Sequence, residues 1–368
     1  MITSTQLQKL VRFFLLLCLE VQFNSVQFFF SSLLETPAEI MTIRFLVNFG
    51  LLALPIAITL GVLIGLNSSR EASGGPPLFK PDPKPTAPKK KNGITTEQHC
   101  QKSYGIHPDT KGQEYTLNPN QWGWNEGDDG GLCLYVDINN NETYATKTTA
   151  PRWSVVWEYP QGPETAPVHA FPNIKVDGSV FPAKLNTIDK IEIDFEWTYA
   201  LGNGSAKGAT QATKTDLAAM KKNLLNANVA MDMFMDSDQK KAQDSEDASH
   251  EIMVWFAAIG PATQPLGFNV DGSNPLATKT LHGTEFKLYY DTNQAKQKVL
   301  TWYVDEPTEK FDGDLWPLIE EILSMDNANY PSSSDYIGYM SWGTEAYSAN
   351  TTVTFDVPSL SINVEKKA

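Results

Sequence analysis

The sequence predicts an all-β fold: a jelly-roll sandwich of two antiparallel sheets with one packed α-helix. Short runs of β-branched and aromatic residues recur through the last two thirds of the chain, with Gly, Pro, Asn and Asp between them. Only one segment has clear helical periodicity, and there is no internal repeat. Such spacing is typical of a sandwich or jelly roll. We expect strands at residues 153–159, 190–199, 229–235, 251–259, 285–290, 299–304, 336–342 and 352–357.

The expected helix lies late in the chain and would pack on a sheet through one apolar face. Its apolar residues follow the spacing i, i+3, i+4, i+7 and i+8, namely Leu315, Leu318, Ile319, Ile322 and Leu323. A weaker helix is expected within residues 213–226. Residues 236–249 are polar and charged, and they predict a surface loop before the strand at 251–259.

The first 97 residues lack the pattern of the fold. Residues 45–66 form an uncharged apolar run, long enough to cross a bilayer core. A Pro/Lys-rich stretch follows, which is typical of an extended, semi-rigid spacer. We therefore expect an N-terminal extension (1–44), a transmembrane or signal-anchor segment (45–66), a linker (67–97) and a folded domain (98–368).

The apolar run has a second interpretation. It could belong to a cleaved signal peptide that begins at Met41, with residues 1–40 as an extension of the gene model. We favour a retained single-pass anchor, because the run is long for a signal peptide and no small-x-small cleavage site is clear.

Charge and glycosylation motifs place the folded domain outside the cell. The chain carries a formal net charge of −14, and an acidic body repels nucleic acid. Asn141, Asn203 and Asn350 each begin an Asn-x-Ser/Thr motif, consistent with a secretory route. The Lys-rich flank after the apolar run argues against a domain outside the cell, but the glycosylation motifs and a cysteine pair outweigh it. We expect an extracellular or membrane-anchored protein, monomeric and without a nucleic-acid partner.

A glutamate lies inside each of two segments that otherwise predict buried strands. In the first, Glu251, Met253 and Trp255 share one face of the strand, and the residues between them form an apolar face. Burial of an unpaired charge is costly, so an acid in such a run is rare. Glu345 lies in the second segment. Two such glutamates suggest acid/base chemistry by a carboxyl pair on a sugar.

Each glutamate also has an ordinary structural explanation. Glu251 could be a charge that protects a sheet edge from aggregation, and Glu345 could pair with a lysine at a rim. Asp232 could be a buried structural acid, and Trp122 and Trp255 could be core tryptophans.

Five segments, in order, resemble glycoside hydrolase family 12, the family of endo-β-1,4-glucanases and xyloglucanases. Asn120-Gln121-Trp122-Gly123 resembles the family's Asn-x-Trp-Gly, and residues 168–173 resemble Val-Lys-Ser-Tyr-Pro-Asn. Residues 227–234 resemble Ala-Asn-Val-Ala-Tyr-Asp-Leu-Phe, and residues 251–255 resemble the nucleophile strand. Residues 343–347 resemble Gly-Thr-Glu-Pro-Phe. The departures include Ala346 for Pro, Ala349 for Gly and Met231 for Tyr, and they bear on specificity more than on the reaction.

The resemblance implies a role for each candidate residue. Glu251 would be the nucleophile, Glu345 the acid/base and Asp232 the acid that orients the nucleophile. The expected substrate-binding residues are Asn120, Trp122, Met253 and Trp255.

The resemblance also implies a disulfide between Cys100 and Cys133, because relatives carry one near the N-terminus at similar spacing. Two free buried thiols are the alternative.

The expected function is a retaining endo-acting glycoside hydrolase that cleaves β-1,4-glucan backbones by double displacement. A xyloglucan-specific endoglucanase is the alternative within that class. A non-catalytic lectin-like binding module, and more remotely a structural wall protein, are the alternatives outside it. The five histidines are scattered without metal-ligand spacing, and there is no phosphate loop or dinucleotide motif, so we expect no metal and no cofactor.

Overall fold

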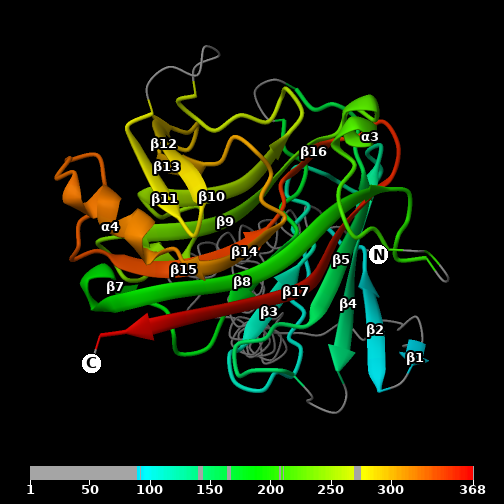
Figure 1. The fold of residues 1–368 in the computed structure, drawn as a ribbon, viewed down its shortest axis with the longest axis horizontal. Coiled ribbons are helices and arrows are strands. Elements are labelled where there is room, and N and C mark those ends of the chain that lie inside the picture. Colours follow the sequence, from blue (N-terminus) through cyan, green and yellow to red (C-terminus); the bar gives the residue numbers. More distant parts are fainter. Residues whose placement is uncertain are drawn as a thin grey trace, which may run out of the picture. The chain divides into compact units, whose positions relative to one another are not determined.

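The computed structural model describes residues 89–367, apart from residues 92, 140–143, 164–166, 207–208, 210 and 269–274. These residues form two β-sheets packed face to face, so the predicted fold class is confirmed (Figure 1). The expected anchor, residues 45–66, lies outside this range. Within the range, no helix is long and apolar enough to cross a membrane.

The first sheet, sheet A, has seven strands in the described part of the chain. In spatial order they are β1 (Lys89–Lys91), β2 (Ile94–His99), β4 (Gly131–Asn139), β5 (Arg152–Glu158), β17 (Val353–Lys366), β8 (Ile188–Leu201) and β14 (Lys310–Asp314). The last strand in the sequence, β17, runs antiparallel between β5 and β8, beside the long β8 (Figure 1).

The second sheet, sheet B, carries the predicted strands that contain Asp232 and Glu251. Its order is β11 (Ala277–Leu281), β12 (Thr284–Thr292), β13 (Lys298–Tyr303), β10 (His250–Ile259), β9 (Asn226–Asp236), β15 (Tyr336–Gly343), β6 (Asn173–Val176) and β3 (Tyr115–Asn118). β16 (Ala346–Ser348) pairs with β9, and β7 (Ala183–Lys184) pairs with β15. The β10–β13 pair is parallel, a departure from the purely antiparallel sheets expected.

The core lies between the two sheets and follows the alternation of each strand. Ile252, Val254 and Phe256 of β10 are fully buried, as predicted for the apolar face of this strand. Phe256 packs edge-on against Phe195 of β8, with ring centroids 4.6 Å apart. Trp157 of β5 is also in this core, with 1% of its surface exposed. The other face of β10, which carries Glu251, is therefore turned away from sheet A.

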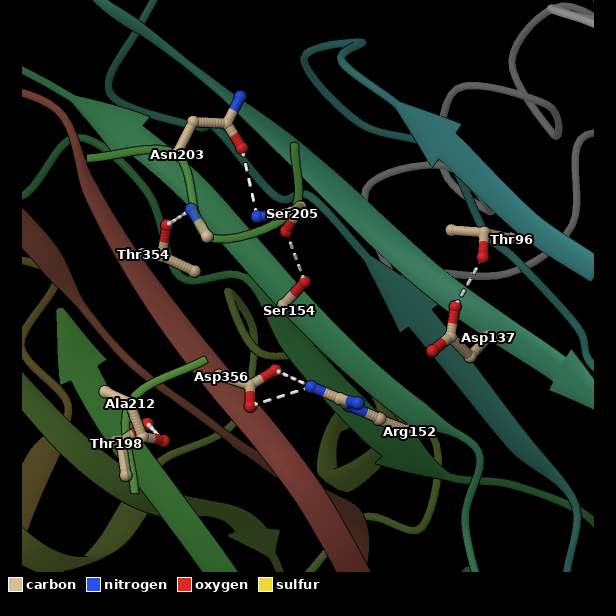
Figure 2. A network of polar contacts seen from close by, with 11 residues as sticks. Thr96, Asp137, Arg152, Ser154, Thr198, Asn203, Ser205, Ala212, Thr354 and Asp356 are labelled. Carbon is tan, nitrogen blue, oxygen red and sulfur yellow. Dashed lines mark hydrogen bonds and ion pairs between the residues drawn. The ribbon is translucent and has the colours of Figure 1, made fainter. Parts of the chain in front are cut away.

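The outer face of sheet A, which is turned away from the core, is polar (Figure 2). Arg152 forms an ion pair with Asp356 at 2.9 Å, which joins β5 to β17. Ser154 and Ser205 share a hydrogen bond of 2.7 Å. Apolar residues on one face and polar residues on the other are typical of an antiparallel sheet with one face in water.

Both predicted helices are present. α4 (Trp316–Ser324) buries Leu318, Ile319 and Ile322, and the indole of Trp302 on β13 donates to the Leu318 carbonyl at 3.1 Å. The weaker helix is shorter than expected: α3 spans Leu217–Lys222 and ends just before Leu224, whose φ is +51°. The predicted loop at 236–249 contains the short 3₁₀ turn η2 (Lys241–Gln243), and a second such turn is η1 (Leu185–Thr187).

The folded domain begins earlier than expected. The linker was predicted at residues 67–97, but β2 lies largely within that stretch and pairs with β4 along its whole length. β1 also precedes residue 98 and pairs with β2. β2 has the sequence Ile-Thr-Thr-Glu-Gln-His, which has only one apolar residue and so gave no clear strand alternation.

The expected disulfide is confirmed. Cys100 and Cys133 are bonded, 33 residues apart in the sequence. The bond links Cys100, directly after β2, to Cys133 of β4, and the Gln121 side chain donates to the Cys100 carbonyl at 3.3 Å.

Candidate active site

The three predicted acids come together on the face of sheet B that is turned away from sheet A, called here the site face. Alternation places Glu251 and Met253 of β10 on this face, and the register sets Met253 beside Asp232 of β9. Glu345 follows β15 directly, in the connection to β16, and its amide N–H is bonded to the Asn228 side chain on β9 at 2.8 Å. β9 thus holds one acid and anchors the loop that carries another.

Asp232 and Glu251 form a carboxyl–carboxyl hydrogen bond, which requires one shared proton. Burial and the nearby Glu251 charge raise the pKa of Asp232 well above its usual range. Burial also raises the pKa of Glu251, to about 7, and the hydrogen bond from Asp232 limits that rise. Asp232 is therefore the partner that keeps the proton, and Glu251 is the partner that ionises first. The second oxygen of Asp232, Oδ1, is buried without a hydrogen-bond partner among the described residues.

Glu345 is held by two donors. The Asn228 amide and the Tyr347 hydroxyl both bond to its Oε2, the latter at 3.3 Å. Burial, followed by the charge of Glu251, raises the pKa of Glu345 to about 7, while the two donors oppose the rise. A carboxyl with this pKa can be protonated near neutral pH, which is what a general acid requires.

The charge of Glu251 is one cause of the raised pKa of Glu345. Because one negative charge makes a second one less favourable, this charge favours the protonated form of Glu345. The hydrogen bond from Asp232 lowers the pKa of Glu251 and so favours its ionised form. One ionised and one protonated carboxyl at the same face is the arrangement that a retaining glycosidase needs.

The predicted binding residues differ in exposure. Met253 and Trp255 are buried, at 7% and 3% exposed, and the Trp255 indole N–H points at the Met253 sulfur, 3.4 Å away. They form a small apolar cluster with Ala230 and Val299 on the site face. This cluster can form an apolar floor, but Trp255 offers little free ring surface.

Trp122 is 52% exposed, in a loop tied to the site. The backbone of residues 120–123 bonds to residues 169–171, and these bond to β16, where the Ala346 N–H donates to the Ala170 carbonyl at 2.8 Å. The loop that carries Trp122 is therefore linked, through one intervening segment, to the strand that follows Glu345. An exposed indole so placed can stack on a pyranose ring.

Asn120 begins this loop with a φ of +43°, a conformation that asparagine tolerates better than most residues. Its N–H bonds to the Asn118 side chain at 2.9 Å and its carbonyl accepts from Phe171 at 3.0 Å. These contacts define the backbone of Asn120, and its side chain makes no hydrogen bond recorded in the described structure.

A cavity of about 890 Å³ adjoins the site face at the start of β9. Asn226, two residues before Asn228, lines it together with Ala258 and Ser348, and Leu217 and Leu224 contribute apolar surface. Among the described residues, no three His, Cys, Asp or Glu side chains are grouped to hold a metal ion.

Asn228 and Tyr347 were not among the predicted site residues. The signal for Asn228 was present, since it is four residues before Asp232 on a strand and so shares its face. Tyr347 lies two residues after Glu345, but the fold of that connection is set by pairing with β9 and by residues 169–171, which are distant in sequence.

The fold and the acids of the site face define a glycosidase. The family model of Glycosyl hydrolase family 12 matches residues 210–365, the part of the chain that carries Asp232, Glu251 and Glu345.

The chain is also similar to two named relatives and, in its fold, to one solved structure. The probable xyloglucan-specific endo-β-1,4-glucanase A of Aspergillus clavatus is 29% identical over 246 residues, which cover 67% of this chain and 84% of that protein. The xyloglucan-specific endo-β-1,4-glucanase A of Emericella nidulans is 27% identical over 245 residues, 67% and 83% of the two chains. Endoglucanase 3 of Trichoderma harzianum shares the fold, with a TM-score of 0.55 at 20% identity over 75% of this chain and all of that one.

Proposed function

We propose that this protein is a retaining endo-β-1,4-glucanase, with Glu251 as nucleophile and Glu345 as acid/base. The observation that carries the proposal is that the two glutamates lie on one face and that, of the two, only Glu251 is hydrogen-bonded to Asp232. The asymmetry gives the two carboxyls different tasks. It also argues against a lectin-like module, which has no use for a buried acid pair.

In the first step the Glu251 carboxylate attacks the anomeric carbon, and the bond to the leaving glycosidic oxygen breaks. Glu345 gives its proton to that oxygen, so the leaving chain departs as an alcohol and a glycosyl ester forms on Glu251. In the second step Glu345, now ionised, takes a proton from water. The water oxygen bonds to the anomeric carbon, Glu251 leaves as a carboxylate, and both acids return to their starting states.

Asp232 would hold Glu251 in line and keep its negative charge favourable. Trp122 would stack on a sugar ring, the Met253–Trp255 cluster would form an apolar floor, and Asn120 would bond to a sugar hydroxyl.

Azide rescue would test the two roles separately. Glu345→Ala should lose nearly all hydrolysis of a polymer, and azide should restore turnover of an activated aryl glycoside to give a β-glycosyl azide. Glu251→Ala with azide should give the α-azide instead, because azide then replaces the missing nucleophile. Glu285→Ala, a change at an exposed glutamate of β12, is the matched control and should hydrolyse normally. The same azide anomer from both site variants would contradict the assigned roles.

Both relatives are named as xyloglucan-specific, which makes xyloglucan the first candidate substrate. Initial rates on xyloglucan, mixed-linkage β-glucan and carboxymethyl cellulose would decide it. A rate on xyloglucan more than tenfold above the others supports a xyloglucanase, and comparable rates support a general endoglucanase.

We propose an extracellular location, supported by the disulfide and by the exposed Asn203 and Asn350 of two glycosylation motifs. The third motif, at Asn141, lies outside the described residues. The membrane anchor at residues 45–66 and the monomeric state stay predictions. Fractionation of expressing cells and light scattering of the purified protein would test them.

A further inference from the structure

The two oxygens of the Glu345 carboxyl have different surroundings. Oε2 accepts from the Asn228 amide and from the Tyr347 hydroxyl. Oε1 makes no hydrogen bond recorded in the described part of the chain. Both donors therefore act on one oxygen, and the other is left for a substrate or water.

This asymmetry decides where an acidic proton would lie. An amide N–H and a phenol O–H that both point at Oε2 occupy its acceptor positions and favour it as the carbonyl-type oxygen. A proton on Oε2 would face these two donors, so the proton of neutral Glu345 belongs on Oε1. A phenol can accept as well as donate, but the Asn228 amide N–H can only donate, so a proton on Oε2 would still face one fixed donor.

Tyr347 is well suited to hold this position. It is 6% exposed and lies on β16, two residues after Glu345, and its hydroxyl reaches Oε2 of Glu345 at 3.3 Å. Burial and the nearby Glu345 raise the pKa of the Tyr347 phenol well above its usual range, so it stays a donor at all working pH values. The family segment that residues 343–347 resemble has phenylalanine here, which lacks the hydroxyl.

We propose that Tyr347 is a positioning residue for the acid/base: with Asn228, its hydroxyl fixes Oε2 of Glu345 as the acceptor oxygen and directs the transferable proton to Oε1. The inference rests on the proposed role of Glu345. It goes further in naming the oxygen that delivers the proton and a residue that controls it.

The first test is the pH profile of kcat/KM for Tyr347→Phe on the soluble glucan that the wild type cleaves fastest. The other ionisable groups acting on Glu345 are Glu251 on β10 and Asp232 on β9, and this substitution leaves both in place. A donor to a carboxylate lowers its pKa, so its loss should raise the pKa of Glu345. Activity that needs protonated Glu345 should then persist about 0.5–1 pH unit further into the alkaline range, with the acid limb unmoved.

The second test varies the need for a proton. Tyr347→Phe should lower kcat/KM on the polymer by about 3–10-fold, because the proton is no longer held on one oxygen. For 2,4-dinitrophenyl β-cellobioside, whose leaving group departs without a proton, kcat/KM should stay within about twofold of the wild type. A loosened structure would slow both substrates alike.

Two controls separate the possible failures. Tyr303→Phe removes a hydroxyl that makes no bond to Glu345, from β13 of the same sheet, and should leave the midpoint of the alkaline limb unchanged. Unchanged limbs for Tyr347→Phe, or equal losses on both substrates, would overturn the proposal if Glu345→Ala is inactive on polymer. An active Glu345→Ala would instead overturn the proposed function itself.

Discussion

Asp232 should control the acid limit of activity, and two substitutions at this position separate its hydrogen bond from its charge. Asp232→Ala removes the donor to Glu251, whereas Asp232→Asn keeps an N–H donor of similar size. Because the raised pKa of Asp232 keeps it protonated while Glu251 ionises, the wild-type donor is a neutral group, and asparagine resembles it.

The size of the effect follows from the hydrogen bond that is lost. A bond to a charged acceptor contributes about 1.5–3 kcal/mol, and one pKa unit corresponds to about 1.4 kcal/mol. The pKa of Glu251 should therefore rise by about 1–2 units in Asp232→Ala. Since the nucleophile must be ionised, the rise moves the acid limb of kcat/KM to higher pH and narrows the active range. Little charge repulsion is relieved in return, because Asp232 is neutral in the active state.

The assay is kcat/KM against pH for the wild type and both variants, on one soluble β-glucan. Asp232→Asn should keep its acid limb within about half a unit of the wild type, and Asp232→Ala should show the full shift. Equal shifts in both variants would mean that the carboxyl acts through its charge. No shift in either would mean that Asp232 does not govern the titration of Glu251.

Other features of the structure give further expectations. The first product should be the β-anomer, which proton NMR of early product would show; an initial α-anomer would mean inversion. Trp122→Ala should lose about 1–3 kcal/mol of transition-state binding, seen as a lower kcat/KM at an unchanged Tm. The core change Trp157→Ala should instead cost about 3–5 kcal/mol of stability and lower Tm by roughly 10 °C. An early-melting Trp122→Ala with normal kinetics would mean that Trp122 supports the fold. Opening the disulfide by Cys100→Ser with Cys133→Ser should cost about 3–4 kcal/mol by loop-closure entropy, read from denaturant unfolding, and an unchanged midpoint would contradict this. The folded protein raises the pKa of Glu345 from 4.5 to about 7. The contribution of Glu345 to folding stability is therefore complete below pH 4.5 and is lost as pH rises through 7. Glu345→Gln should raise Tm more above pH 7 than below pH 4.5.

The alternation of side chains along the central strands could be predicted because those strands have a complete apolar face. The apolar face of β10 is buried as predicted, and the acids of β9 and β10 share the opposite face. Strands at the sheet edges escaped prediction. β11 and β14 alternate weakly and carry polar residues, because an edge strand is only half covered. β3 and β6 have four residues each, too few for a period of two to stand out.

The contacts around Glu345 were beyond the reach of local pattern. Asn228 and Glu345 are 117 residues apart, and their hydrogen bonds exist only because β9 pairs with both β15 and β16. The parallel pairing of β10 with β13 is another long-range result, since alternation is the same in either direction. The strand pattern therefore pointed to Glu251 and Glu345, and the family resemblance added Asp232, while pairing across the sheet determined how each side chain is held.

The placement of β17 affects how the domain can fold. This strand is the last in the sequence, yet it lies between β5 and β8 in sheet A, and the Arg152–Asp356 ion pair ties it to β5. Until β17 has been synthesised, β5 and β8 each present an unpaired edge, and the sheet lacks one of its central strands. Most native contacts of the sheet then form between distant parts of the chain, which slows folding and exposes strand edges to other chains. Deletions that remove β17 should therefore yield insoluble protein, although every residue of the acid site precedes it.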